Sequence, residues 1–265
     1  MSGPGQSAGV SGGAAVAVRD LTIGWGDVIL ACGIGFEVQR GEIFAILGGS
    51  GAGKSTLLRY LIGLERPRKG DIDIGGHGPP DLDRGLPPFG VMFQEGALFG
   101  SMTVLENVSL PLCQWAALDH DAVQTVARSK LHLVGLQNDA DKLPAEISGG
   151  MTKRAAIARA LALDPAIAFL DEPSAGLDPV TAVELDNLIL TLARTTALTV
   201  VMVTHELESV FRIADRCLLL DKASRGVLAV GDPRALRSSR DPRIYRFFNP
   251  ASGGKERSWR PRPTT

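Results

Sequence analysis

Residues 43–61 read IFAILGGSGAGKSTLLRYL, and this stretch decides the fold. Its apolar run from Ile43 to Leu47 is typical of a strand that is buried on both faces. The next eight residues, Gly48 to Ser55, fit the phosphate-loop pattern G-x-x-x-x-G-K-[ST]. Apolar residues with helical spacing follow at once. A strand, a glycine-rich loop and a helix in this order predict a phosphate-binding unit.

The residue types of this loop suit phosphate groups. Glycines let the backbone curl until its N–H groups point at phosphate oxygens, and the positive end of the following helix adds to the attraction. We expect Lys54 to reach the β- and γ-phosphates and Ser55 to supply a hydroxyl to Mg²⁺. The alternative is a glycine-rich turn with a solvated lysine. The residues predicted to bind nucleotide are Gly48, Gly49, Ser50, Gly51, Ala52, Gly53, Lys54, Ser55 and Thr56.

The rest of the chain alternates between strand-like and helix-like segments. Further runs that predict buried strands lie at 90–93, 167–170, 198–203 and 217–220. This alternation predicts an α/β fold with a largely parallel sheet. Between about Gly96 and Leu163 the strand-like runs stop and helical patterns dominate, for instance at 122–134 and 152–163. We expect a helical lobe, residues 96–163, inserted into the sheet domain.

Length and composition limit the classes of function. With 265 residues, of which 45% are hydrophobic, the chain can bury a sizeable core. The formal net charge of -1 gives no overall field that would attract nucleic acid, so we expect no nucleic-acid partner. No apolar run approaches the roughly 18 residues that a membrane span needs.

The two ends of the chain differ from its middle. Residues 1–14 are rich in Gly, Ser and Ala and lack the basic start and apolar core of a secretory signal, which predicts a flexible tail. The main domain is expected at 15–240. Residues 241–265 are rich in Arg, Pro and Gly and are expected to be partly disordered. A basic end of this kind is either solvated or touches a second subunit or anionic lipid; it contains Lys255, Arg257, Trp259, Arg260 and Arg262.

The cysteines and histidines do not indicate a metal site. Cys32, Cys113 and Cys217 are far apart and have apolar neighbours, so we expect reduced thiols in or near the core. Cysteines that bind a metal usually occur as closely spaced pairs together with histidines, and the four histidines offer no such cluster.

Two acids follow a predicted buried strand. Asp171 and Glu172 come directly after the apolar residues 167–170, at the carboxyl edge where open α/β sheets bind ligands. Asp171 suits support of Mg²⁺, and Glu172 suits polarisation of a water molecule. The alternative is a solvated strand end. His205 follows the run 198–203 and is a candidate to hold the γ-phosphate or the attacking water, although a lone histidine is more often structural.

Together these segments resemble an ABC ATPase. The resemblance covers roughly Val16 to Asp232 and has the family's order and spacing. It rests on GGSGAGKS at 48–55, Gln94 after a strand, ISGGM at 147–151, FLDEP at 169–173, SAGLD at 174–178 and His205. It implies a P-loop NTPase, or RecA-like, core with an inserted helical subdomain, and ATP as the nucleotide.

The resemblance also implies roles for single residues. Trp25 would stack on adenine, Gln94 would link Mg²⁺ to a permease contact, and Asp178 would lie at a dimer seam. The alternative is that Trp25, which lies between two glycines, is a loop aromatic that packs on the fold. Ser148, Gly149 and Gly150 would face the ATP that a second copy holds, so two chains would sandwich two ATP molecules. Ile147 and Met151 depart from the commonest form of this segment, and we expect altered contacts there, not lost activity.

A narrower resemblance concerns residues 93–112, the Ser-Gly-Gly-Met ending and the late segment DPRIYRFF, which are similar to the ATPases of MCE-linked, Mla-type lipid transporters. It implies an integral permease as partner, an MCE-domain protein, in some systems a STAS-domain protein, and a peripheral position on the cytoplasmic face of the inner membrane. A small-solute importer or exporter, or a non-transport ABC ATPase such as a cell-division regulator, remains the alternative.

Overall fold

The structure is a computed structural model that describes residues 13–81, 83 and 85–250. Two sheets organise this part of the chain. The smaller is antiparallel, in the order β2 (Val28–Val38), β1 (Val16–Trp25), β4 (Lys69–Ile74). The larger has the order β5 (Phe89–Met92), β6 (Ile167–Asp171), β7 (Thr199–Val203), β3 (Ile43–Gly48), β8 (Arg216–Asp221), β9 (Gly226–Gly231).

The larger sheet confirms the predicted α/β fold. Its neighbouring strands are parallel from β5 to β8, and β9 is antiparallel to β8. Each of the five apolar runs forms one of the parallel strands. Phe44 and Ile46 of β3 pack into one hydrophobic core, and Ile43, Ala45 and Leu47 pack into the other. Burial on both faces explains why these strands are continuously apolar.

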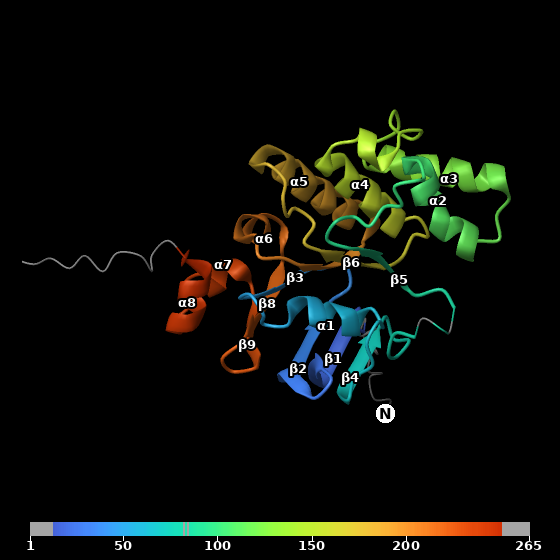
Figure 1. Cartoon of the computed structure of the whole chain (residues 1–265). Helices are drawn as coiled ribbons and strands as arrows, with labels where there is room; N and C mark the ends of the chain where they lie inside the picture. The colour runs from blue at the N-terminus through green and yellow to red at the C-terminus, as the bar shows by residue number, and fades with distance from the viewer. Residues whose placement is uncertain (1–12, 82, 84, 251–265) are drawn as a thin grey trace, which may run out of the picture.

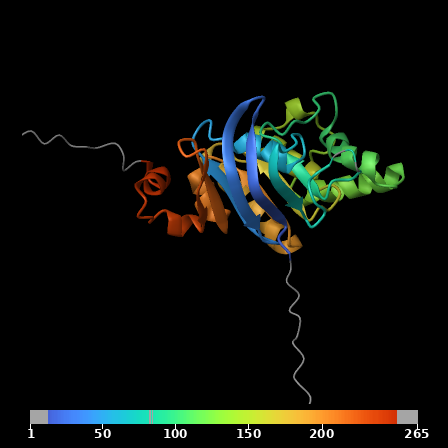
Figure 2. The same cartoon turned by 90° about the horizontal axis from the view of Figure 1, so that it is seen from below.

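The helices form layers around the larger sheet. Helix α1 (Lys54–Leu61) lies between the two sheets and contributes Leu57 and Leu61 to the core they share (Figure 1). On the other face lie α4 (Gly149–Ala160), α5 (Pro179–Thr196) and α6 (Leu207–Ile213). The three-stranded sheet, β1 and β2 foremost, is seen from its open side in Figure 2. The phosphate loop therefore has packed structure on both sides.

The helices α2, α3 and α4 pack on one another beside β5. They are α2 (Val104–Trp115), α3 (His120–Leu133), and α4, which follows the short 3₁₀ helix η2 (Pro144–Glu146). A capping box fixes the start of α2, since the Thr103 side chain accepts from the Glu106 N–H and Glu106 accepts from the Thr103 N–H. We refer to α2, α3, η2 and α4 as the helical lobe.

The C-terminal end of the described chain is more ordered than its composition predicts. After α7 (Pro233–Leu236), residues Pro242–Phe248 form α8 at the end of the molecule opposite the helical lobe (Figures 1 and 2). Ile244 and Phe248, four residues apart, are buried, and the Phe248 ring lies 6.0 Å from that of Phe211. The predicted tail at 1–14, except for residues 13 and 14, and the basic residues 255–262 lie outside the described residues.

The prediction that all three cysteines lie in or near the core is wrong for two of them. Cys32 and Cys113 are exposed, because the apolar residues beside them point inward while they face outward. Cys217 is buried on β8, and burial raises the pKa of its thiol to about 12. No helix in the described ranges has both the length and the apolar character to span a bilayer.

Candidate active site

Strand register brings the predicted site residues to one edge of the larger sheet. Parallel pairing sets Asp171 of β6 opposite Val203 of β7, and Val203 opposite Ile46 of β3. The chain beyond each strand therefore leaves the sheet at the same level. This edge carries the phosphate loop after β3, Glu172 after β6 and His205 after β7. Gln94, two residues beyond β5, lies at the same edge, since Met92 pairs with Leu170.

The phosphate loop joins β3 to α1 through a turn that requires glycine. Gly53 precedes the first turn of α1 with φ 94°, and a Cβ there would lie 3.1 Å from Ile23 Cδ1. The Lys54 ammonium donates to the Gly48 carbonyl at 2.9 Å and to the Gly49 carbonyl at 3.4 Å. The lysine charge is thereby held over the loop whose N–H groups suit phosphate oxygens.

Two cavities meet at Lys54. One, of about 310 Å³, is lined by Trp25, Leu30, Gly51, Gly53, Lys54, Ser55 and Thr56. The other, of about 650 Å³, is lined by Gly48, Gly49, Ser50, Lys54, His205, Leu207, Arg246, Phe247 and Pro250. The first offers an aromatic ring and the second offers cationic side chains. This division suits the base and the terminal phosphates of one nucleotide.

Glu172 and His205 form a hydrogen-bonded pair at this edge. The His205 Nδ1 atom lies 2.8 Å from Glu172 Oε1, and the His205 backbone N–H donates to Glu172 Oε2 at 3.3 Å. Glu172 is buried and has φ 46°, in the left-handed region that a non-glycine residue rarely adopts. Strained backbone of this kind persists only where its surroundings hold it. A carboxylate held by an imidazole is suited to accept a proton from water.

Asp171 has a different environment from its neighbour. Its Oδ1 atom is buried and has no hydrogen-bond partner among the described residues. Burial raises the pKa of this carboxyl, and the nearby Glu172 raises it further. A buried oxygen without a partner at the end of β6 and the exposed Ser55 at the start of α1 fit a divalent cation that is bound mainly by phosphates. The described residues contain no group of three or more His, Cys, Asp or Glu that could hold a metal ion without phosphate ligands.

Trp25 stands at the end of β1 with 45% of its surface exposed. The Arg59 guanidinium of α1 lies 5.1 Å from the Trp25 ring centroid, a cation–π distance. The Tyr60 hydroxyl donates to the Gly24 carbonyl at 3.1 Å. Helix α1, which begins at the phosphate loop, therefore also fixes the aromatic ring that lines the smaller cavity.

Ser148, Gly149, Gly150 and Asp178 line neither cavity. Ser148 is exposed and caps α4, since its hydroxyl accepts from the Met151 N–H at 3.3 Å. Asp178 caps α5, and the Thr181 hydroxyl donates to it at 2.5 Å and lowers the pKa of its carboxyl. These residues present helix N-termini to the outside. The structure therefore brings together only part of the predicted site within one chain.

Three residues that no sequence motif marks hold segments around the site in place. They are Arg59 behind Trp25, Asn107 at the start of the helical lobe, and Lys153 on α4. A signal for Lys153 exists, because it shares the buried face of α4 with Gly150 and Ile157 at helical spacing. A lysine within an apolar stripe indicates a buried partner.

Known proteins are similar to this chain in sequence. A family model described as "ABC transporter" matches residues 32–175. The "Intermembrane phospholipid transport system ATP-binding protein MlaF" of Escherichia coli (strain K12) is 37% identical over 244 residues, 90% of each chain. The "Probable ribonucleotide transport ATP-binding protein mkl" of Mycobacterium leprae (strain TN) is 38% identical over 242 residues, 89% of this chain and 69% of the relative.

A solved structure agrees in fold. The dimeric post-hydrolysis state of the ATP-binding cassette MJ0796, bound to ADP and Pi, superimposes with a TM-score of 0.71. The two sequences are 30% identical, and the match covers 82% of this chain and 98% of the other. The match to the family model, residues 32–175, includes the phosphate loop and the Asp171–Glu172 strand end. The chain therefore belongs to the ABC transporter family, as an ATP-binding subunit that hydrolyses ATP.

Proposed function

We propose that the protein works as a homodimer that closes around two Mg-ATP molecules and drives an integral permease that moves phospholipid across the cell envelope. One observation carries the dimer: Ser148, Gly149, Gly150 and Asp178 are outside both cavities of their own chain. A second copy supplies these helix N-termini to the γ-phosphate. Dimeric cassettes among the solved structures support this arrangement.

Hydrolysis follows from the groups at the sheet edge. A water oxygen attacks the γ-phosphorus while the Glu172 carboxylate takes the water proton, and the bond to the bridging oxygen of ADP breaks. His205 holds the carboxylate through Nδ1, 2.8 Å away. Lys54 offsets the negative charge of the phosphates. Mg²⁺, when bound with the help of Ser55, Gln94 and Asp171, supplies further neutralisation of phosphate charge.

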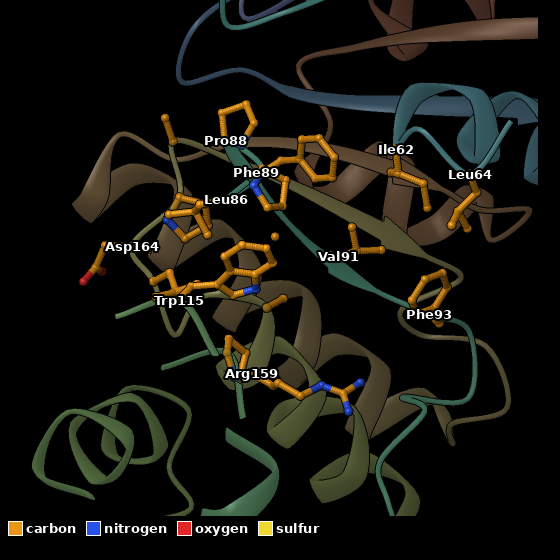
Figure 3. A pocket seen from close by; sticks show the side chains of 17 residues that line it. Ile62, Leu64, Leu86, Pro88, Phe89, Val91, Phe93, Trp115, Arg159 and Asp164 are labelled. Atoms are coloured by element: carbon orange, nitrogen blue, oxygen red, sulfur yellow. The ribbon is translucent and has the colours of Figure 1, made fainter. Parts of the chain in front are cut away.

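A groove beside the helical lobe fits the permease. This cavity, of about 510 Å³, lies between β5, α2 and the end of α4, and Figure 3 shows the rings of Phe89, Phe93 and Trp115 around it. Phe93 and Trp115 are 40% and 44% exposed, although both are large and apolar. Such a patch marks a partner site. Phe93 directly precedes Gln94, so a helix of the permease in this groove would move the loop that reaches the nucleotide.

The proposed transported substrate rests on similarity to relatives. Similarity to MlaF extends over 90% of both chains, and that protein's name places it in phospholipid transport between membranes. The mycobacterial relative is named for ribonucleotide transport instead. We favour lipid, with MCE-domain and STAS-domain proteins as further partners and the subunit on the cytoplasmic face of the inner membrane.

Reconstitution tests the proposal. The membrane complex that co-purifies with the tagged chain is placed in proteoliposomes, and ATP-dependent movement of labelled phospholipid and labelled ribonucleotide is followed. A matched complex with Glu172→Gln is the control. We expect phospholipid to move only with the wild-type subunit. Movement of ribonucleotide alone would contradict the cargo, and recovery of a membrane partner that transports neither would favour a non-transport role.

A further inference from the structure

Lys153 is a buried lysine that the catalytic scheme above does not use. It lies in the second turn of α4 and is 7% exposed. Burial lowers the pKa of its ammonium, although the carboxylates of Glu172, Asp171 and Glu95 counteract this effect. A buried cation is unfavourable unless hydrogen bonds compensate for the lost water.

The compensating bonds connect two functional segments. The Lys153 ammonium donates to the backbone carbonyl of Gln94 and, at 3.1 Å, to the backbone carbonyl of Glu172. Gln94 is 59 residues before Lys153 in the chain, and Glu172 is 19 residues after it. Lys153 thus joins the helical lobe to the loop after β5 and to the residue that acts as general base.

The contact with Glu172 falls where the backbone is strained. Glu172 has φ 46°, and four groups hold it. Its N–H donates to the Val203 carbonyl at 2.8 Å, and its carboxylate pairs with His205. Its carbonyl accepts from Lys153 and, at 3.3 Å, from the Ala175 N–H. Of these, Lys153 alone belongs to the helical lobe. A rotation of α4 would therefore move a donor that contacts the backbone of Glu172.

We propose that Lys153 is a positioning residue that sets Glu172 and the Gln94 loop for hydrolysis according to the position of α4. This inference rests on the proposed function, because the N-terminus of α4, at Ser148, is the part expected to meet the ATP of the second chain. Lys153 then connects the nucleotide at one site to the base at the other. A donor fixed in place affects turnover more than ATP binding.

The experiment compares Lys153→Met with a matched control, Lys130→Met, in the full-length chain and its membrane complex. Lys130 is also buried in the helical lobe, at 6% exposure, but its ammonium pairs with Asp164, which precedes β6, whereas Glu172 follows the other end of that strand. We expect Lys153→Met to lower kcat by roughly 10- to 100-fold with little change in the KM for ATP. Lys153→Arg, which keeps donors for both carbonyls, should recover most of kcat. Lys130→Met should lower Tm and leave kcat near wild type.

The other results are equally decisive. If Lys153→Met keeps the wild-type kcat, or if kcat and Tm fall together to the same extent in both methionine variants, the positioning role is wrong. If Lys153→Met does not fold, Lys153→Leu, which also lacks a donor, takes its place, and an unchanged kcat would overturn the proposal. Glu172→Gln is measured in parallel: activity in that variant would overturn the proposed base itself, whereas its inactivity beside an active Lys153→Met removes only the role of Lys153.

Discussion

Asp171 and Glu172 are adjacent in the chain, but their carboxylates have opposite surroundings. Glu172 is hydrogen-bonded to His205, and one carboxyl oxygen of Asp171 is buried and has no hydrogen-bond partner within residues 13–81, 83 and 85–250. The raised pKa of Asp171 has a defined effect on stability. Because the folded-state pKa lies above 3.8, the folded chain loses stability as the pH rises from that value through the raised one. The site is therefore less stable at neutral pH than it would be without this charge.

Asp171→Asn should separate stability from function. We expect the variant, free of nucleotide and Mg²⁺ at pH 7, to melt a few degrees above wild type, since about 1 kcal/mol corresponds to roughly 2–4 °C for a domain of this size. We also expect Mg-ATP to raise its Tm less than that of wild type. Scanning calorimetry with and without Mg-ATP measures both effects. A lower Tm in the nucleotide-free variant would contradict the account of the unpartnered oxygen.

Trp25 allows a second test at this scale. Stacking of a base on an aromatic side chain is worth about 1–3 kcal/mol, so Trp25→Ala should weaken ATP binding by roughly 5- to 150-fold. Trp25→Phe should weaken it much less. Trp115→Ala is the matched control, since Trp115 is equally exposed but lies in the groove of the helical lobe. Titration calorimetry with the Glu172→Gln chain measures the affinity. Equal affinity in Trp25→Ala would show that the ring does not contact the base.

Single residues were predictable from sequence where a local motif names them. The residues of the phosphate loop, Asp171, Glu172 and His205 lie at strand ends, and strand ends can be recognised from apolar runs. Arg59 and Lys153 could not be assigned roles, because Trp25 and Gln94, which they contact, are 34 and 59 residues away in the chain. Only the folded arrangement brings such pairs together.

At the scale of elements, Asn107 fixes the loop between β5 and the helical lobe. Asn107 is fully buried, accepts from the Phe99 N–H at 2.8 Å, and donates to the carbonyls of Phe99, Met102 and Thr103 at 2.9 to 3.1 Å. One side chain therefore satisfies the backbone of a whole turn. This turn follows the Gln94 loop, so its order would affect the proposed nucleotide and permease contacts of that loop.

Asn107→Ala should leave these backbone groups without partners. Each unsatisfied buried group costs about 1–3 kcal/mol, so we expect the free energy of unfolding to fall by at least about 2 kcal/mol. Gln114→Ala, on the exposed side of the same helix, should change it by less than about 0.5 kcal/mol. Urea denaturation measures both values. A loss in Asn107→Ala no larger than in the control would contradict the structural role of this side chain.

Some elements were predictable and others were not. Continuous apolar runs predicted the five parallel strands, because burial on both faces leaves few positions for polar residues. The composition of residues 241–265 does not predict helix α8, because the helix offers a single i,i+4 pair of buried apolar residues, Ile244 and Phe248. The separate sheet of β1, β2 and β4 was also not anticipated, since its strands alternate between faces and pair across bulges.

For the whole molecule, the order of the motifs allowed the family to be predicted, and the fold agrees. In the proposed dimer, helix N-termini of a second copy complete the site, and the sequence of one chain does not show which ones. The positions of Ser148 and Asp178 outside both cavities support this proposal. The central claim is therefore that ATP joins two chains and that Glu172 is needed to release them.

The most direct test measures ATP turnover and molecular mass for wild type and Glu172→Gln with Mg-ATP. We predict that the variant binds ATP, hydrolyses it at least about 100-fold more slowly because the general base is lost, and accumulates as a dimer. The wild type should return to monomer as ATP is consumed. A Glu172→Gln chain that hydrolyses ATP at the wild-type rate while remaining a monomer would contradict both the role of Glu172 and the two-chain site.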